Sequence, residues 1–416
     1  MKKDDIVSLA SRAKRVSEKL AVLTTAVKNR ALTKMAGALT RRKKLILREN
    51  EKDVASAKRR GLSSALTNRL HLDEKKLRGM AESILSISKL SDPIGKILSE
   101  RRRPNGLLIQ KVRVPLGVIL IIYESRPNVT ADCMALCLKS GNGVILKGGK
   151  EAFYSNRAIY HVLEEAAVEA GIPEGFSEFV PADHEAVRAL LGLSGVIDLV
   201  IPRGGEELIR EVARISKIPV IKHFKGVCHV FVDRKADFEK AAAIVLNAKV
   251  QNPAVCNAME TLLVDEKVAV VFLPRVAQAL LEKGVEIRGC ETTRRILPDV
   301  KSAEEEDWYA EYLDLILAVR VVKDLDQAIG HIQTYGSHHS DAIVTEDKKA
   351  ARRFTKEVDS ACVFVNCSTR FSDGGEFGMG AEMGISTDKL HARGPMGLEE
   401  LTSYKYVVLG NGQIRR

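Results

Sequence analysis

The stretch Val118-Ile119-Leu120-Ile121-Ile122-Tyr123 is a continuous apolar run of strand-forming residues. An apolar run without polar alternation is typical of a strand that is buried on both faces of a parallel sheet. It is too short to cross a membrane, because a spanning helix needs about 20 apolar residues. The run therefore predicts a buried strand in an α/β domain.

Shorter apolar runs follow this strand and alternate with helical stretches, which is the pattern of a mostly parallel sheet with helical crossovers. A second series follows Asn252, so we expect a second α/β domain to begin near residue 230 to 250. The expected strands are 143–147, 176–180, 196–201, 219–222 and 227–232 in the first series, and 260–264, the region of 285, 315–322, 342–344 and 362–366 in the second.

The regions outside these domains carry other patterns. Apolar residues recur at helical spacing before residue 100, whereas Asn105-Gly106 adjoins a stretch of period two and predicts a hairpin. The tail 402–408 predicts one more strand, which is remote in sequence from any hairpin partner. We expect this strand and the hairpin to form a small sheet between subunits.

The composition limits the class of protein. The 416 residues are 45% hydrophobic and 29% charged, which is typical of a globular protein and excludes wholesale disorder. The net charge of +11 fits a nucleic-acid partner, an anionic ligand or only a basic surface. The basic run 41–44 lacks interleaved aromatic residues and is soon followed by acidic ones, so it favours a solvated helix face.

Seven cysteines without a Cys-x-x-Cys pair exclude a disulfide framework and a zinc ribbon, and they indicate free thiols in a reducing compartment. The amino terminus shows no secretory signal, so we expect a cytoplasmic protein. The pairs His184-Glu185 and His338-His339 lack the spacing of metal ligands, and we expect no metal site.

Cys256 differs from the other cysteines in its surroundings. It follows a turn-rich break after the helix expected at 238–249 and precedes the strand expected at 260–264. A nucleophile needs a constrained loop, whereas a thiol on an apolar face packs in the core. From the residues alone, Cys256 is either a nucleophile or a structural thiol. The cysteines expected in the core or beside strands are Cys133, Cys137, Cys228, Cys290, Cys362 and Cys367.

Two glycine-rich loops follow expected strands. Lys147-Gly148-Gly149-Lys150 ends one strand and Pro202-Arg203-Gly204-Gly205 ends another. Ligands of open α/β sheets bind at the carboxyl ends of strands, and glycines beside cationic side chains suit the phosphorylated ribose of NADP. Together the loops favour a dinucleotide site, and a basic loop without a ligand is the alternative.

Three long motifs occur in one order along the chain. They are Tyr123-Glu124-Ser125-Arg126-Pro127-Asn128-Val129-Thr130, Val255-Cys256-Asn257-Ala258-Met259-Glu260-Thr261 and Ser368-Thr369-Arg370-Phe371-Ser372-Asp373-Gly374-Gly375-Glu376-Phe377-Gly378. With 384–387, 391–397 and 401–405 they extend over nearly the whole chain. In these motifs the chain resembles the γ-glutamyl phosphate reductases, the proline-biosynthesis members of the aldehyde dehydrogenase superfamily.

This resemblance implies an α/β enzyme of the aldehyde dehydrogenase fold that reduces L-glutamyl 5-phosphate with NADPH to L-glutamate 5-semialdehyde and releases phosphate. Cys256 matches the family's nucleophile, which forms a thioester, and Asn128 matches the asparagine that stabilises the oxyanion. The segment 222–228 has no carboxylate where hydrolytic relatives carry a base, which favours phosphorolysis. Lys225 departs from the aspartate often found there.

Further site residues follow from the resemblance. Glu311 matches the glutamate that contacts the nicotinamide ribose, but Asp314-Leu315 replaces the usual Ala-Pro. Arg126 and Arg370 are expected either to bind the substrate's anionic groups or to form structural ion pairs. The expected cofactor positions are Lys147, Gly149, Lys150, Pro202, Arg203, Gly204 and Gly205.

The resemblance also implies a domain arrangement. Residues 1–102 and 118–230 form the expected NADPH-binding domain, 231–385 the catalytic domain, and 103–117 with 401–416 the oligomerisation sheet of a dimer or tetramer, while 386–400 returns to pack on the cofactor domain. A glutamate 5-kinase is a further partner to consider, and we expect neither nucleic acid nor membrane. The alternatives are a hydrolytic NAD(P)-dependent semialdehyde dehydrogenase and, more remotely, a basic nucleic-acid-binding protein.

Overall fold

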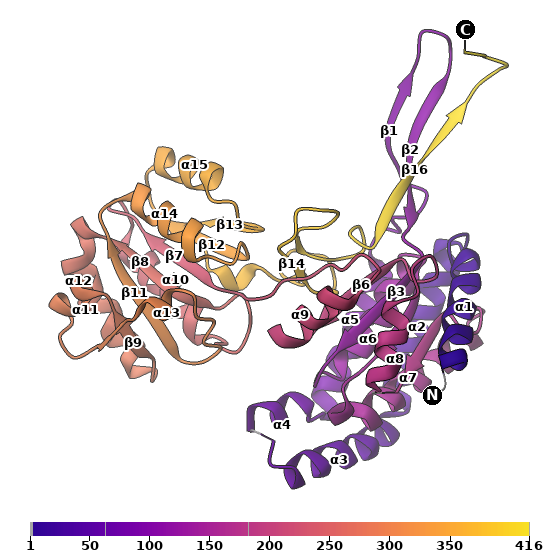
Figure 1. Cartoon of the computed structure of the whole chain (residues 1–416), viewed down its shortest axis with the longest axis horizontal. Helices are drawn as coiled ribbons and strands as arrows, with labels where there is room; N and C mark the ends of the chain where they lie inside the picture. The colour runs from indigo at the N-terminus through magenta and orange to yellow at the C-terminus, as the bar shows by residue number, and fades with distance from the viewer. Residues whose placement is uncertain (1–2, 63, 182, 416) are drawn as a thin grey trace. The chain divides into compact units, whose positions relative to one another are not determined.

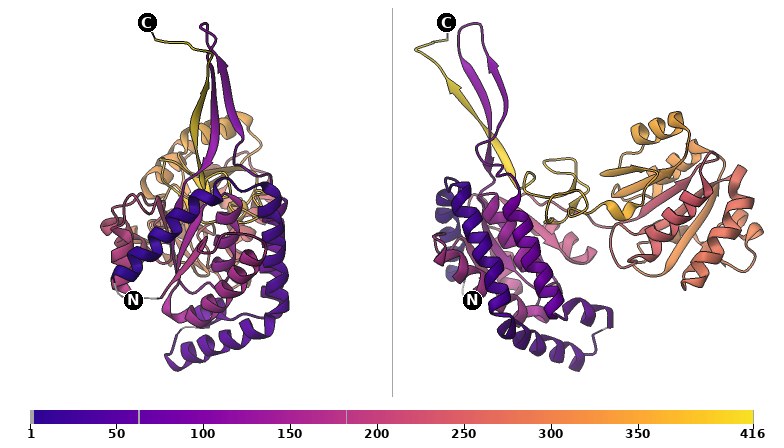
Figure 2. Two further views of the ribbon diagram at one scale, coloured as in Figure 1. Left: turned by 90° about the vertical axis from the view of Figure 1, so that its right-hand side faces the viewer. Right: turned by 180° about the vertical axis from the view of Figure 1, so that it is seen from behind.

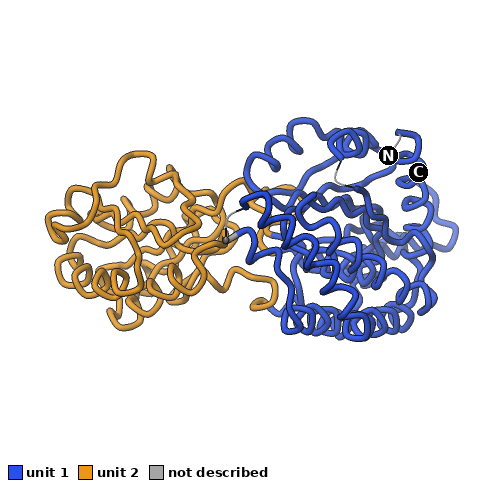
Figure 3. The backbone as a smooth tube through the Cα atoms, turned by 90° about the horizontal axis from the view of Figure 1, so that it is seen from below, with its two compact units in different colours: residues 1–222, 378–384, 396–416 blue, residues 223–377, 385–395 orange. Residues whose placement is uncertain are grey.

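The computed structural model describes residues 3–62, 64–181 and 183–415, and it divides into two compact units (Figure 3). Unit 1 comprises residues 1–222, 378–384 and 396–416, and unit 2 comprises 223–377 and 385–395. Each unit contains a parallel sheet covered by helices, so the expected α/β class is confirmed. No helix within the described ranges is long and apolar enough to cross a membrane.

Unit 1 is built around a four-stranded parallel sheet in the order β5-β4-β3-β6. Every residue of β3 is buried, as its unbroken apolar sequence requires. The expected strand 219–222 is reduced to one isolated bridge. The strands are β3 (Val118–Tyr123), β4 (Gly143–Lys147), β5 (Ser177–Val180) and β6 (Leu199–Arg203).

Helices cover both faces of this sheet (Figure 1). The apolar side chains of α1, α8 and α9 pack in one core cluster with β3 and β4. Helices α6 and α7 contact the sheet, and α2 and α5 pack on them. The helices are α1 (Lys3–Leu20), α2 (Thr25–Arg41), α3 (Lys43–Arg59), α4 (Ser64–Leu70), α5 (Glu74–Lys89), α6 (Asn128–Lys139), α7 (Phe153–Glu169), α8 (His184–Leu191) and α9 (Glu206–Ile215), with the short turn η1 (Lys150–Ala152).

A three-stranded antiparallel sheet projects from the body of unit 1 (Figures 1 and 2). It consists of β1 (Ile97–Arg102), β2 (Leu108–Pro115) and β16 (Thr402–Leu409), and β16 pairs with β2 of the same chain. The sequence prediction began the hairpin at residue 103 and assigned the residues of β1 to the cofactor domain. This boundary was wrong, because β1 pairs with β2 across a turn in which Gly106 has a φ of +88°.

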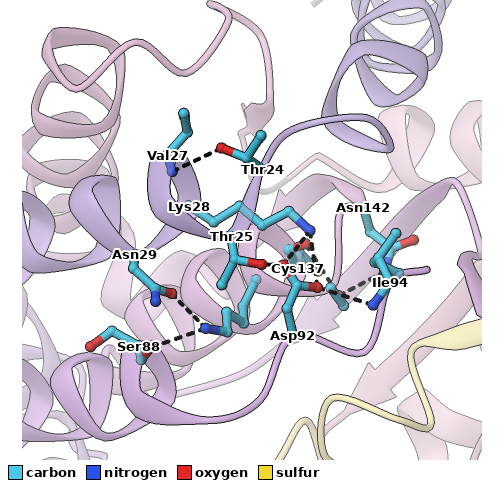
Figure 4. Close-up of polar contacts among 12 residues, drawn as sticks. Thr24, Thr25, Val27, Lys28, Asn29, Ser88, Asp92, Ile94, Cys137 and Asn142 are labelled. Carbon is cyan, nitrogen blue, oxygen red and sulfur yellow. Dashed lines mark hydrogen bonds and ion pairs between the residues drawn. The ribbon is translucent and has the colours of Figure 1, made fainter. Parts of the chain in front are cut away.

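A buried polar cluster holds the root of this hairpin to unit 1 (Figure 4). Lys28 on α2 is fully buried, and its Nζ lies 3.1 Å from Asp92 Oδ2. Asp92 also accepts the backbone N–H of Ile94 at 3.0 Å, and buried Lys139 on α6 donates to the Ser88 carbonyl at 3.0 Å. Since a buried charge is costly unless paired, the cluster fixes the loop that leads into β1.

Unit 2 contains a seven-stranded parallel sheet in the order β10-β9-β11-β8-β7-β12-β13. One core cluster packs α10 and α11 against it and a second packs α14 and α15. The strands are β7 (Cys228–Val232), β8 (Met259–Asp265), β9 (Glu286–Gly289), β10 (Lys301–Ser302), β11 (Ile316–Val322), β12 (Ser340–Val344) and β13 (Cys362–Val365), with the small pair β14 (Ile385–Ser386) and β15 (Gly394–Pro395). The helices are α10 (Phe238–Val250), α11 (Glu266–Glu282), α12 (Glu291–Ile296), α13 (Glu305–Trp308), α14 (Leu325–Tyr335) and α15 (Lys348–Glu357), with the turn η2 (Thr369–Phe371).

The units differ from the expected domain division at three places, one of which is the segment 378–384: it was expected in the catalytic domain and lies in unit 1. Strand β7 pairs with β8 and β12, so unit 2 begins at 223 and not at 231. The segment 386–395 packs on unit 2 and not on the cofactor domain, because Lys389 and Arg393 form ion pairs with Asp359 at 2.5 and 2.6 Å. Only the end of the expected return segment lies in unit 1.

Candidate active site

The predicted cofactor residues of unit 1 lie at the carboxyl ends of neighbouring strands. Strand β3 lies between β4 and β6, with Lys147 in register with Ile122 and Arg203 in register with Tyr123. The connection reverses direction at β3, and ligands of open α/β sheets bind at such a switch point. Lys147 is half-buried, and burial lowers its pKa. The fold therefore brings the loops 147–150 and 202–205 together at the carboxyl ends of the strands.

Two carboxylates, of Glu151 and Glu124, bind the backbone of loops at this end of the sheet. Glu151 Oε1 accepts hydrogen bonds from the N–H and the hydroxyl of Ser125, at 2.7 and 2.9 Å. Glu124 Oε2 accepts the N–H of Gly205 at 3.0 Å. A Cβ on Gly204 would overlap the Glu124 carboxylate, which explains the glycine, whereas a Cβ on Gly205 would meet no atom within 4 Å. The backbone at Gly205 is thus open to a ligand.

Arg126 and Asn128 lie just before and at the start of α6, and both side chains are exposed. The Asn128 amide donates to Asp132 Oδ2 at 3.3 Å, and burial raises the pKa of Asp132. Lys150 is exposed on η1, at the end of β4. Their roles toward oxyanion, substrate and cofactor stay predictions.

Cys256 of unit 2 lies on the loop between α10 and β8, and its side chain is partly exposed. A buried ion pair spans the ends of this loop, with Lys249 Nζ 2.6 Å from Glu260 Oε2. Burial raises the pKa of Glu260 to about 7 and lowers the pKa of Lys249. Cys228 is fully buried, and burial raises its pKa well above the ordinary value. Cys256 therefore has the accessibility and the fixed loop that a nucleophile requires.

The backbone of Cys256 packs against the segment that precedes β7. A Cβ on Gly226 would overlap the carbonyl oxygen of Cys256, so glycine is required for this close approach. The N–H of Gly226 donates to Glu311 Oε1 at 2.9 Å. The segment 222–228, which has no carboxylate of its own, is therefore in contact with one from Glu311.

Two histidines lie beside Cys256. Its sulfur and one ring nitrogen each of His223 and His339 lie within 4.8 Å of one another. His223 Nδ1 lies 2.9 Å from the carbonyl oxygen of Ile385, which can only accept, so Nδ1 carries the proton. The three residues precede β7, β8 and β12, and only the assembled sheet brings them together.

Arg370 lies on η2 and contacts the nucleophile loop. Its Nε donates to Gln251 Oε1 at 2.8 Å, and its Nη1 donates to Asn257 Oδ1. Burial lowers the pKa of Arg370, while Asp373 and the nearby Cys256 sulfur favour its charged form. These hydrogen bonds go to neutral amides, and the role of Arg370 in substrate binding stays a prediction.

The segment 311–315 departs from the family pattern and is held by the same ion pair. Glu260 Oε1 accepts the N–H of Leu313 at 3.2 Å, and Leu313 has a φ of +52°. Asp314 Oδ1 accepts the N–H of Leu315 at 2.7 Å, which fixes a local turn. Glu260 therefore links the Cys256 loop to the segment that carries Glu311.

The sequence predictions omit four residues of this site: His223, His339, Lys249 and Glu260. The two histidines have no sequence spacing that relates them to Cys256, because each precedes a different strand. The ion pair has a weak signal, since Lys249 ends a largely apolar helix and Glu260 lies in an apolar strand on the other side of the Cys256 loop.

Comparisons with known proteins agree on one family. The model of the aldehyde dehydrogenase family matches residues 1–287. A γ-glutamyl phosphate reductase of Carboxydothermus hydrogenoformans is 59% identical over 99% of this chain and 100% of its own length. The crystal structure of γ-glutamyl phosphate reductase from Thermotoga maritima is 47% identical, with a TM-score of 0.96 over 99% of this chain and 100% of that one. The chain therefore belongs to the γ-glutamyl phosphate reductases, within the oxidoreductases of the aldehyde dehydrogenase family.

Proposed function

We propose that this chain reduces L-glutamyl 5-phosphate to L-glutamate 5-semialdehyde with NADPH and releases phosphate, a step in proline synthesis from glutamate. The observation that carries the proposal is a partly exposed Cys256 on a loop held by a buried ion pair, with the Arg370 guanidinium beside it. The name shared by relatives more than 50% identical along the chain supports the choice of substrate.

The proposed chemistry runs through the Cys256 sulfur. The thiolate attacks the acyl carbon, the bond from that carbon to the phosphate oxygen breaks, and phosphate leaves with the electron pair. NADPH would supply the hydride that converts this thioester to a thiohemiacetal on Cys256. When the carbon–sulfur bond of the thiohemiacetal breaks, the aldehyde leaves and Cys256 is again a thiolate. The proposed donors to the anionic oxygen are the Asn128 amide and the N–H of Cys256, and loss of one such donor typically costs about 10²–10³-fold in rate.

His223 and His339 are the proposed acceptors of the Cys256 thiol proton. Because Nδ1 of His223 faces a carbonyl oxygen, its Nε2 is the basic nitrogen of that ring. Arg370 places a positive charge near the Cys256 sulfur. No water-activating base is needed, because phosphate is the leaving group and the aldehyde is released without hydrolysis.

The carboxyl ends of the strands in unit 1 have the charge and the space to bind a phosphorylated dinucleotide. Lys147 and Lys150 supply cations, and the open space at Gly205 admits close approach to the backbone. Helix α9 begins after Gly205, and the positive end of its dipole favours an anion there. We propose that these residues, with Gly149 and 202–204, hold NADPH, and that Glu311 contacts the nicotinamide ribose.

We also propose that the sheet β1-β2-β16 joins copies of this chain. Strand β16 is an edge of the sheet, and Tyr406 and Val408 on it are 63% and 53% exposed. An exposed edge with apolar residues is a template for pairing with another chain. Light scattering on the wild type and on Val408→Lys measures this directly, and an unchanged mass contradicts the assembly.

The deciding experiment measures NADP⁺ reduction by glutamate 5-semialdehyde, with and without inorganic phosphate. We expect strict dependence on phosphate and a loss of at least about 10³-fold in Cys256→Ala. The control is Cys290→Ala, since Cys290 is also partly exposed but follows β9, at the carboxyl end of that strand, whereas Cys256 precedes β8. Turnover without phosphate would favour a hydrolytic dehydrogenase, and an active Cys256→Ala enzyme would remove Cys256 from its role.

A further inference from the structure

The group formed by His223, Cys256 and His339 has the donor set of a transition-metal site. Thiolate and imidazole are the ligands that Zn²⁺ and Co²⁺ prefer, and three protein ligands leave one position open for water. We infer that these three side chains bind one such ion reversibly and that the bound ion withdraws the Cys256 sulfur from acyl transfer. The inhibition rests on the proposed function, whereas the binding does not.

The distances allow one ion to contact all three side chains. The three donor atoms lie within 4.8 Å of one another. Zinc bonds of about 2.3 Å to sulfur and about 2.0–2.1 Å to nitrogen place the ligands of a tetrahedral ion about 3.5 Å apart. His339 is buried, whereas His223 and Cys256 are partly exposed on loops, so small rotations of these two side chains close the remaining distance.

The neighbours of the histidines resemble the outer contacts of metal ligands. A metal-binding histidine commonly donates its other N–H to a carbonyl or carboxylate, which fixes the ring. His223 makes such a bond to the Ile385 carbonyl, at 2.9 Å. His339 Nδ1 lies 2.9 Å from Ser340 Oγ and 3.7 Å from Cys228 Sγ, which also orient its ring. The two rings lie at 69° with centroids 5.5 Å apart.

The chemistry of the group also limits which ions it takes. It contains no carboxylate, so Mg²⁺ and Ca²⁺, which prefer oxygen ligands, have no matching donor set. The Arg370 guanidinium lies near the Cys256 sulfur, and its positive charge repels a metal cation bound there. We therefore expect reversible binding that a chelator removes.

Cobalt absorption tests the site without an activity assay. The reduced full-length protein is titrated with Co²⁺ in buffer free of phosphate. We expect a thiolate-to-cobalt charge-transfer band that is absent in Cys256→Ala and at least about 100-fold weaker in affinity in His223→Ala, since loss of even an outer contact costs about 10–100-fold. The band is expected unchanged in Cys290→Ala and in His338→Asn, because asparagine tolerates the φ of +59° at 338.

A protection experiment provides the second measurement. Zn²⁺ is expected to slow alkylation of Cys256 by iodoacetamide, Mg²⁺ is expected to have no effect, and EDTA is expected to restore labelling. A wild type without the band, a band that survives in Cys256→Ala, or equal protection by Mg²⁺ overturns the inference. If Cys256→Ala loses the band but keeps full activity, the metal site stands and the proposed function fails. If Cys256→Ala is inactive while the wild type binds no Co²⁺, the function stands and the metal site fails.

Discussion

The two units place their candidate residues at opposite ends of their parallel strands. In unit 1, Lys147 and Arg203 end β4 and β6, at the carboxyl ends, where the chain turns into helices whose dipoles point their positive ends at the loops. In unit 2, Cys256, His339 and Glu311 precede β8, β12 and β11, at the amino ends. The carboxyl ends therefore suit an anion held by backbone dipoles, whereas the amino ends suit a nucleophile held by side chains from several loops.

After Cys256→Ala, the largest loss of kcat is expected for Gly226→Ala. The added Cβ would overlap the Cys256 carbonyl oxygen, so the nucleophile loop must shift. A misplacement of about 1 Å costs about 10²-fold, and we expect kcat to fall by at least that factor. The control is Gly330→Ala on α14, where a Cβ meets no atom within 4 Å. Normal kcat in Gly226→Ala would show that the amino-end loops are not fixed by this contact.

Each unit has a buried lysine paired with a carboxylate, Lys28–Asp92 in unit 1 and Lys249–Glu260 in unit 2. Comparing them tests whether the pair in unit 2 supports activity as well as stability. Glu260→Ala and Asp92→Ala each leave a fully buried lysine without its carboxylate, and each is expected to lower the free energy of unfolding by about 3–5 kcal/mol. Only Glu260→Ala is expected to lower kcat, because Lys249 and Glu260 span the Cys256 loop. Denaturant unfolding and kcat of the folded fraction measure the two effects. An equal loss of kcat in both variants would contradict the distinction.

The carboxyl-end loops of unit 1 are tested by Lys147→Ala and Lys150→Ala. A hydrogen bond to a charged group contributes about 1.5–3 kcal/mol, so each variant is expected to raise KM for NADPH about 10–100-fold. The KM for NADH is expected to change less, because NADH lacks the ribose phosphate. Equal changes for both cofactors would place these lysines elsewhere on the dinucleotide.

The smallest effect is expected for the local stability of the segment 385–395, which should depend on pH. Lys389 and Arg393 lower the pKa of Asp359 to about 2, from an ordinary value of 3.8. A lowered pKa means that Asp359 contributes stability above the ordinary value and loses it as the pH falls through the lowered one. Amide hydrogen exchange in 385–395 should therefore be faster in Asp359→Asn at neutral pH, and the wild type should approach the variant toward pH 2. Identical exchange at neutral pH would contradict this.

Burial explains which parts of the fold the sequence could predict. Strands β3 and β4 have the expected bounds, because burial on both faces requires an unbroken apolar run. Strand β1 has six exposed residues, Ile-Leu-Ser-Glu-Arg-Arg, and therefore carries no apolar pattern. The loop of Cys256 set it apart from the other cysteines as a candidate, whereas His223 and His339 reach it only because β7 lies between β8 and β12. That order is set by long-range pairing and leaves no local signal.

The chain passes between the units after residues 222, 377, 384 and 395, and this connectivity sets an order of assembly during translation. The strands of the large sheet of unit 2 have all been synthesised by residue 365, well before β16 is made. The edge of β2 that pairs with β16 therefore stays unpaired on the nascent chain until β16 leaves the ribosome. A ribosome that stalls before residue 402 leaves a protein whose large sheet is complete but whose β2 edge is bare. The unpaired β2 edge of such a truncated product would be a template on which strands of other chains can pair, so the product would be prone to aggregate.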